Sequence, residues 1–509
     1  MKKQFFLRIL SLVIVLPMIL VGCSTPTNNS AGQISSSPSK DSITIGIGAD
    51  ITNLDGRHST AMLELRIYEN IYDTLIVYRD GEFKPSLAEK WEVSDDGLEY
   101  TFYLNKGVKF HNGEELKAID VKDTLDSWPG TPNMYDLTQI IKAAEVIDDY
   151  KVKIILNNPS GLFMINMASM GYIYSTKAIT ELGDAYATQP IGTGAYKFVE
   201  HKKGISVEFD AFDEYFKGKP AIKHLSFKVI PDTNTMVTAL ETHDIDFAYS
   251  IPVASVPIFE GNNKITLSPL EGIRINWFTM NTQKPPFDNK LVRQAMSYAI
   301  NREFINDTLF DGLAFPIDIM ATDNMFGKPE TYKRYEYSPE KAKELLKEAG
   351  YPDGFTLNEK LLTTNSHSKA AEMIMQNLAE IGVNVEIEQL EFGTYIQNLY
   401  AGNFICAMGG YFMITPDVDT PLQMYKTANV GAMNTAQYSN AEVDKLSNAA
   451  CLTNNVDERK ELYKKIFDIV QEESAYAVYS NEVEIPAYNS NLKITNLNSR
   501  NTLVFDMSW

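Results

Sequence analysis

The chain has 509 residues, with 66 acidic and 46 basic side chains that give a formal net charge of −20. This length predicts two to four structural units at roughly 100–200 residues each, and 44% hydrophobic residues exclude a disordered chain. The acidic balance argues against nucleic acid and anionic membrane surfaces as ligands, although it also serves solubility.

The N-terminus predicts an export signal, because a basic start precedes an apolar segment at residues 9–20. That segment is shorter than the roughly 20 residues of a permanent membrane span. The next residues, Leu20-Val21-Gly22-Cys23, resemble the bacterial lipobox. The resemblance implies a lipoprotein signal peptide at 1–22 and a diacylglycerol group on Cys23; the alternative is an ordinary secretory signal with a chance cysteine.

A flexible tether is expected at residues 23–41, which are rich in Ser, Thr, Asn and Pro. The fold is expected to start at residue 42, where isoleucine alternates with small residues as in a strand with one buried face. Further strands are predicted at 98–104, 150–156, 224–230, 274–281 and 383–390.

Helices are predicted between these strands, which indicates an α/β protein of more than one lobe. The clearest spans residues 338–350, with Ser338 as cap, and two others are expected at 288–305 and 457–470. Asp457 is predicted to cap the last of these. Asp120 is predicted to cap a helix that begins at Val121.

No motif points to catalysis, a metal site or a cofactor. The chain lacks a phosphate-binding loop, a zinc-protease HExxH and a GxSxG elbow, and its six histidines are scattered. Cys406 and Cys451 can pair or remain free, and free burial is favoured. We therefore expect a binding protein rather than an enzyme. The alternatives are a secreted hydrolase of cell-wall peptide and a surface adhesin or signal receptor.

Blocks at residues 85–127, 190–249, 280–305 and 337–351 carry a family resemblance. In this order and spacing they resemble the family 5 solute-binding proteins of bacterial ABC importers, which take up dipeptides, oligopeptides and nickel chelates. The resemblance covers nearly all of the chain from residue 42 onward. It implies an α/β, two-lobed periplasmic-binding-protein-like fold of type II, in the large peptide-binder class.

The same resemblance implies the domain organisation. The first lobe would comprise residues 42–270 plus 484–509, and the second lobe residues 271–483. Crossing strands near 271–278 and 482–488 would form the hinge. The ligand would enter the cleft, closure would bury it, and an ABC permease would accept the closed form. The protein is expected to be a monomer, held by acylated Cys23 at the extracytoplasmic face of the cell membrane.

The ligand is less clear from the sequence. Peptide binders of this family usually carry an aspartate, just before an aromatic-Pro-Asp-Pro-Asp stretch, that pairs with the peptide's α-amino group. The matching position here is Ile414, which cannot form an ion pair, whereas Pro416 and Asp417 fit the later part of the pattern. Asp417 is a possible substitute for the missing aspartate.

Further candidate ligand residues follow from the resemblance to the nickel-type members. The arginine expected near Met170 and Gly171 is absent, so Arg274 and Arg500 become candidates for an anionic ligand group. Peptide is the leading ligand, and nickel or another metal chelate is the alternative; each candidate can also be an ordinary surface or core residue. The remaining candidates are Thr60, Met62, Tyr135, Tyr411, Phe412 and Asn501.

Overall fold

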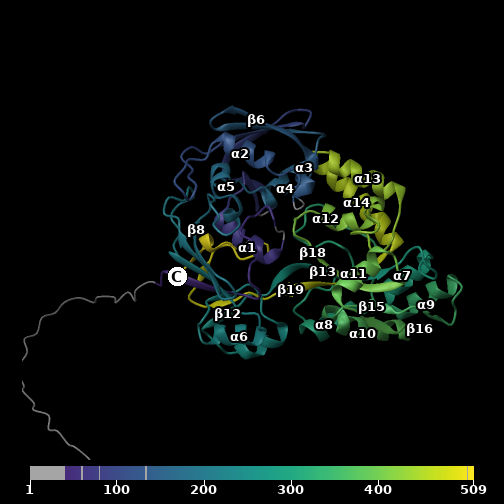
Figure 1. Cartoon of the computed structure of the whole chain (residues 1–509). Coiled ribbons are helices and arrows are strands. Elements are labelled where there is room, and N and C mark those ends of the chain that lie inside the picture. The colour runs from purple at the N-terminus through teal and green to yellow at the C-terminus, as the bar shows by residue number, and fades with distance from the viewer. Residues whose placement is uncertain (1–39, 59–60, 80, 132–133, 501) are drawn as a thin grey trace, which may run out of the picture. The chain divides into compact units, whose positions relative to one another are not determined.

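Two adjacent strands organise the structure, a computed structural model that describes residues 40–58, 61–79, 81–131, 134–500 and 502–509. β13 (Leu270–Met280) and β19 (Tyr476–Glu484) pair antiparallel along most of their length. At one end they continue into β12 (Ile265–Leu267) and β20 (Ala487–Asn489), which also pair antiparallel in a different sheet. The chain therefore passes between two sheets twice, along neighbouring paths (Figure 1).

Two sheets build what we call the first lobe. One runs in the order β12, β20, β11 (Phe247–Ala248), β1 (Ser42–Ile47), β10 (His224–Val229), β9 (Ser206–Ala211) and β8 (Tyr196–Lys202). The other runs in the order β4 (Ala88–Val93), β5 (Glu99–Leu104), β7 (Lys151–Leu156) and β6 (Ile141–Asp148). Two hairpins are made by β2 (Ile76–Arg79) with β3 (Glu82–Pro85) and by β21 (Lys493–Ile494) with β22 (Met507–Ser508).

The second lobe is built on the sheet that contains the two crossing strands. Its order is β17 (Ile387–Gln389), β15 (Leu361–Thr363), β18 (Cys406–Phe412), β13 and β19. A small parallel pair joins β14 (Phe355–Thr356) to β16 (Val383–Asn384). Mixed sheets in two lobes make this the α/β, two-lobed fold that the sequence predicts, while the domain boundaries stay a prediction.

Helices cover both lobes. Those of the first lobe are α1 (Met62–Ile71), α2 (Ala118–Asp126), α3 (Tyr135–Ile140), α4 (Phe163–Met170), α5 (Thr176–Leu182) and α6 (Thr233–Glu241). Those of the second lobe are α7 (Lys290–Ala299), α8 (Arg302–Phe310), α9 (Pro339–Glu348), α10 (Ser368–Glu380), α11 (Phe392–Tyr400), α12 (Asp419–Leu422), α13 (Ala441–Leu452) and α14 (Val456–Glu473). Within the described part of the chain, none of these helices is both long and apolar enough to cross a bilayer.

The sequence of β13 shows how one strand contributes to two cores of the second lobe. Side chains alternate between the two faces of a strand, so neighbours in the sequence enter different cores. Phe278 and Met280 pack with α7, α9 and α10, whereas Ile275 and Trp277 pack with α13 and α14. Both faces are covered, which explains why residues 273–280 are buried except for the half-buried Arg274.

The structure corrects three local predictions. Asp120 does not cap its helix; it is the third residue of α2, and its carboxylate accepts a hydrogen bond from the Lys117 backbone N–H at 2.9 Å. Asn455, not Asp457, caps α14, because the helix begins two residues earlier than expected. The segment 288–305 forms two helices, since Asn301 leaves the helical conformation and caps α8.

Other local predictions are confirmed. Ser338 caps α9 by accepting from the Lys341 N–H, with Pro339 in the first turn. Cys406 and Cys451 are free thiols, and Cys406 is buried in β18.

A second contact joins the lobes away from the crossing strands; we call it the clasp. The Gly161 N–H donates to the carbonyl of Cys451 at 2.9 Å, and Arg459 Nη1 donates to the carbonyl of Gly161 at 2.7 Å. Asn454 reaches the carbonyl of Gly97 at 3.4 Å. Figure 1 shows α13 and α14 beside α3 in this region. The two lobes are thus joined at both the crossing strands and the clasp.

Gly161→Ala should loosen the clasp. A Cβ at residue 161 would lie 2.4 Å from the Thr453 carbonyl oxygen, closer than van der Waals contact allows. We expect the ligand-free variant to show a larger radius of gyration than the wild type in small-angle scattering, with unchanged circular dichroism. Gly48→Ala is the matched control, because a Cβ there meets no atom within 4 Å. An unchanged radius in Gly161→Ala would show that the clasp does not hold the lobes together.

Candidate functional site

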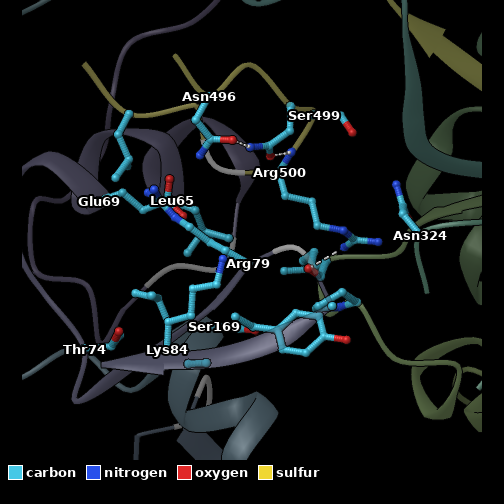
Figure 2. Close-up of a pocket in the computed structure, with 18 of the residues that line it drawn as sticks. Leu65, Glu69, Thr74, Arg79, Lys84, Ser169, Asn324, Asn496, Ser499 and Arg500 are labelled. Carbon is cyan, nitrogen blue, oxygen red and sulfur yellow. Dashed lines mark hydrogen bonds between the residues drawn. The ribbon is translucent and has the colours of Figure 1, made fainter. Parts of the chain in front are cut away.

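A cavity of about 900 Å³ lies between the crossing strands and the clasp, with walls from both lobes (Figure 2). The first lobe contributes α1, the hairpin of β2 and β3, and the C-terminal loop at residues 495–506. The second lobe contributes residues 323–328, Ile414, Pro416 and Lys460. A volume near the top of the roughly 300–1,000 Å³ range of small-molecule sites suits a ligand of several functional groups.

α1 forms one wall by helical periodicity. Met62, Leu65 and Glu69 lie three or four residues apart and so share one face of the helix, which lines the cavity. Arg66, on a neighbouring face, pairs with Glu484 at the end of β19 at 2.9 Å. The helix is thereby tied directly to one of the two crossing strands.

The C-terminal loop forms a second wall. Its ends are held together by β21 and β22 and by the Thr495 N–H, which donates to the Asp506 carbonyl at 3.0 Å. The Arg500 N–H donates to the Asn498 side chain at 3.0 Å, and Ser499 Oγ donates to the carbonyl of Glu271 on β13 at 2.7 Å. The loop is therefore tied to the other crossing strand.

The charges on the wall differ from those of the whole chain. Basic side chains line the cavity at Arg79, Lys84, Lys217, Lys328, Lys460 and Arg500. Fewer acidic ones line it, at Glu69, Asp73, Asp323 and Asp506. Lys217 pairs with Asp73 at 2.9 Å, Arg79 with Asp506 at 3.3 Å, and Lys328 with Asp323. An acidic protein thus surrounds a cavity with a cationic excess.

Glu69 is the exception among the acids, because its Oε2 is buried and has no hydrogen-bond partner among the described residues. Burial raises the pKa of Glu69 to about 8, although Arg66 and Arg79 oppose the shift. The raised pKa favours the neutral form of this carboxyl group. This adds to the cationic character of the wall.

Of the candidate residues, Met62 and Arg500 line the cavity, as does Ile414 at the position of the missing aspartate. Arg500 Nη1 donates to the carbonyls of Met413 and Ile414, the latter at 2.7 Å. The two positions singled out from the sequence are therefore in direct contact. The guanidinium of Arg500 thus lies against the backbone of the position where the family resemblance predicts an aspartate.

Asp417 lies next to this wall but faces away from the cavity. Its carboxylate is buried, and it is 2.6 Å from Arg459 Nη2 and 2.9 Å from the Tyr463 hydroxyl. Breaking such a buried pair leaves an uncompensated charge, so Asp417 is held in the clasp region and cannot turn to a ligand without a large cost. We do not propose it as a ligand residue.

Tyr411 and Phe412 end β18 outside the wall of this cavity, and both are about two-fifths exposed. The guanidinium of Arg274 lies 4.9 Å from the Phe412 ring centre, and its Nε is 3.2 Å from Glu482. Arg274 is thus engaged with other side chains of the second lobe and does not line the cavity.

Several candidates lie outside the described residues. These are Cys23, Thr60 and Asn501. Tyr135 begins α3, and its side chain likewise lies outside the described part. Their neighbours Met62 and Arg500 line the cavity.

Sequence reasoning missed most of the polar wall, above all Glu69, Arg79 and Lys217. One signal was available for Glu69: a carboxylate on an otherwise apolar helical stripe with Met62 and Leu65. Arg79 and Lys217 had no comparable signal, because they reach the cavity only through the packing of separate segments.

Comparisons with known proteins agree with this architecture. Residues 82–432 match the bacterial extracellular solute-binding proteins, family 5 (Middle). The chain is 32% identical to the glutathione-binding protein GsiB of Pectobacterium atrosepticum, over 89% of this chain and 91% of the relative. It is 29% identical to heme-binding protein A of Haemophilus influenzae, over 82% of each chain.

A solved structure also resembles this fold along nearly its whole length. The periplasmic binding protein DppA of Helicobacter pylori, in complex with the peptide STSA, is 28% identical, with a TM-score of 0.76. The match covers 92% of this chain and 98% of DppA. These relatives are substrate-binding proteins and not enzymes, and this chain belongs to the family 5 extracellular solute-binding proteins of bacterial ABC importers.

Proposed function

We propose that this protein captures short peptides in the cavity between its lobes and delivers them to an ABC permease. The observation that carries the proposal is the cavity itself, which has walls from both lobes and is lined by both apolar and polar groups. Aromatic side chains hold variable peptide side chains, and amide and hydroxyl groups hold the peptide bonds. The aromatic residues on the wall are Tyr72, Tyr78, Tyr172, Tyr215, Phe326 and Phe505.

Peptide capture fits two of the three relatives named above, since glutathione is itself a short peptide. The relatives carry names for glutathione and heme binding, and DppA was solved with a peptide. The alternative ligand from the sequence, a nickel or other metal chelate, stays a prediction. Among the described residues the wall has no histidine or cysteine, so a metal there would bring its own ligands.

Capture would proceed by rotation of the lobes about β13 and β19, with the clasp as the second contact in the closed state. Because α1 and the C-terminal loop are each bonded to one crossing strand, strand rotation and ligand contact would be coupled. We propose that the protein acts as a monomer and that the lipid on Cys23 keeps it at the outer face of the cell membrane.

Peptide addition should stabilise the ligand-free protein against thermal unfolding. A ligand at one hundred times its dissociation constant adds about 2.7 kcal/mol to the free energy of unfolding. We would test a mixture of dipeptides and tripeptides and, in parallel, a nickel–histidine chelate, by differential scanning calorimetry. A shift with the chelate and none with the peptides would contradict the peptide proposal and favour the alternative.

Cys23→Ser should release the protein from the membrane and leave peptide affinity unchanged, because the lipid would act only as an anchor. Cell fractionation and mass analysis of the N-terminal peptide would measure both location and acylation. Cys451→Ser is the matched control and should stay in the membrane fraction. Retention of Cys23→Ser in the membrane would show that the anchor lies elsewhere.

A further inference from the structure

Arg500 has an unused hydrogen-bonding edge on the cavity wall. Its Nη1 is anchored on the carbonyls of Met413 and Ile414, but Nε and Nη2 have no partner among the described residues. Both nitrogens are shielded from solvent, so water does not take the partner's place. Buried donors are nearly always satisfied in folded proteins, so this edge requires an explanation.

The unused edge has the geometry of a carboxylate site. Nε–H and Nη2–H are parallel donors on one side of the planar guanidinium, and such a pair binds both oxygens of a carboxylate. No carboxylate of the protein fills this place, since Arg500 has no ion pair among the described residues. The anchored Nη1 fixes the plane of the group, so the edge is oriented before the ligand arrives.

The electrostatics of the site also favour an anion. Burial lowers the pKa of Arg500 to about 10, so the side chain remains charged at neutral pH. The nearest acids that act on it, Glu271 and Glu484, already accept other hydrogen bonds, from Asn481 and Arg66 respectively. A buried cation without a counter-charge is costly, and a ligand carboxylate would offset that cost.

A second pair of unsatisfied groups lies on the same wall. Glu69 Oε2 and Arg79 Nε are both buried without a partner among the described residues. They are close enough for Arg79 to lower the pKa of Glu69. Figure 2 shows Glu69 on the left of the cavity and Arg500 on the right. Glu69 offers an acceptor and Arg79 a donor, and together they suit a polar group of the ligand, whereas the edge of Arg500 suits a carboxylate.

We infer that the ligand is an anionic short peptide, and that its carboxylate is bound by the Nε–Nη2 edge of Arg500. This rests on the proposed function and narrows its ligand class. It also accounts for the missing aspartate: with Ile414 and Arg500 together, this part of the wall recognises a carboxylate end rather than an amino end. Because both nitrogens are shielded in the present arrangement, groups of the wall must move for the carboxylate to reach them.

The test compares the affinity of the wild-type protein for peptides that have a free carboxylate with its affinity for the corresponding amides. The probes are glutathione and its glycine amide, and the dipeptide Met-Leu and its amide, titrated calorimetrically into the full-length ligand-free protein. We expect at least one acid to bind and its amide to bind at least tenfold more weakly, because the amide loses a charge-assisted bidentate contact. Equal affinity for acid and amide, or no binding of either acid, would overturn the inference.

Variants locate the effect. Arg500→Gln should weaken binding of the acid at least tenfold and change the affinity for the amide less than twofold, so that the preference for the acid disappears. Arg500→Lys keeps the charge but not the planar edge, and it should bind the acid more weakly than the wild type does. Arg334→Gln is the matched control, since Arg334 is an exposed arginine outside the cavity wall. A preference that survives in Arg500→Gln would place the carboxylate elsewhere.

The outcomes separate this inference from the proposed function. If an amide binds as tightly as its acid, the result supports peptide capture and contradicts the role of Arg500 as a carboxylate site. If none of the four probes binds and the peptide mixture leaves thermal unfolding unchanged, peptide capture falls as well.

Discussion

The pairing of β13 with β19 is the constraint on which the rest of the structure depends. These strands carry the chain between the sheets of the two lobes along neighbouring paths. In the proposed function the lobes would rotate about them. The same strands hold the cavity walls, through Arg66 on Glu484 and Ser499 on the carbonyl of Glu271. A rotation of the lobes about these strands would therefore also move the groups on the cavity wall.

Charge distinguishes the cavity wall from the rest of the chain. The chain is strongly acidic, yet the cavity wall has more basic than acidic side chains, and several acids there are already paired. Among the described residues of the wall, the buried side-chain polar atoms without a hydrogen-bond partner are Nε and Nη2 of Arg500, Arg79 Nε and Glu69 Oε2. Buried groups of this kind discriminate between ligands, because an unmatched polar group costs more than a matched one gains.

Much of the fold could be predicted from the sequence, because strand alternation and helix periodicity are local. The α/β class and the cap at Ser338 were predicted correctly on that basis, whereas the two-lobed arrangement followed from the family resemblance. Predictions failed where a side chain is compatible with more than one position at the end of a helix. Asp120 has the chemistry of a cap but lies in the third position of α2, and Asn301 ends one helix in order to begin another.

The site was less predictable, for a physical reason. Its residues come from α1, a hairpin, the C-terminal loop and the second lobe, and only packing brings them together. Arg500 and Met62 could be selected from the resemblance, but Arg79 and Lys217 could not. Asp417 shows the opposite case, since a residue with suitable chemistry is held by Arg459 and Tyr463 behind the cavity wall.

Native mass spectrometry of the full-length protein, freshly purified from membranes, tests the central claim most directly. The account predicts that part of the population carries a bound peptide, or a ladder of peptides, each with at least one free carboxylate. Dissociation of these species in the gas phase would release peptides for sequencing. A discrete metal-containing chelate, or neutral and cationic peptides alone, would contradict the account.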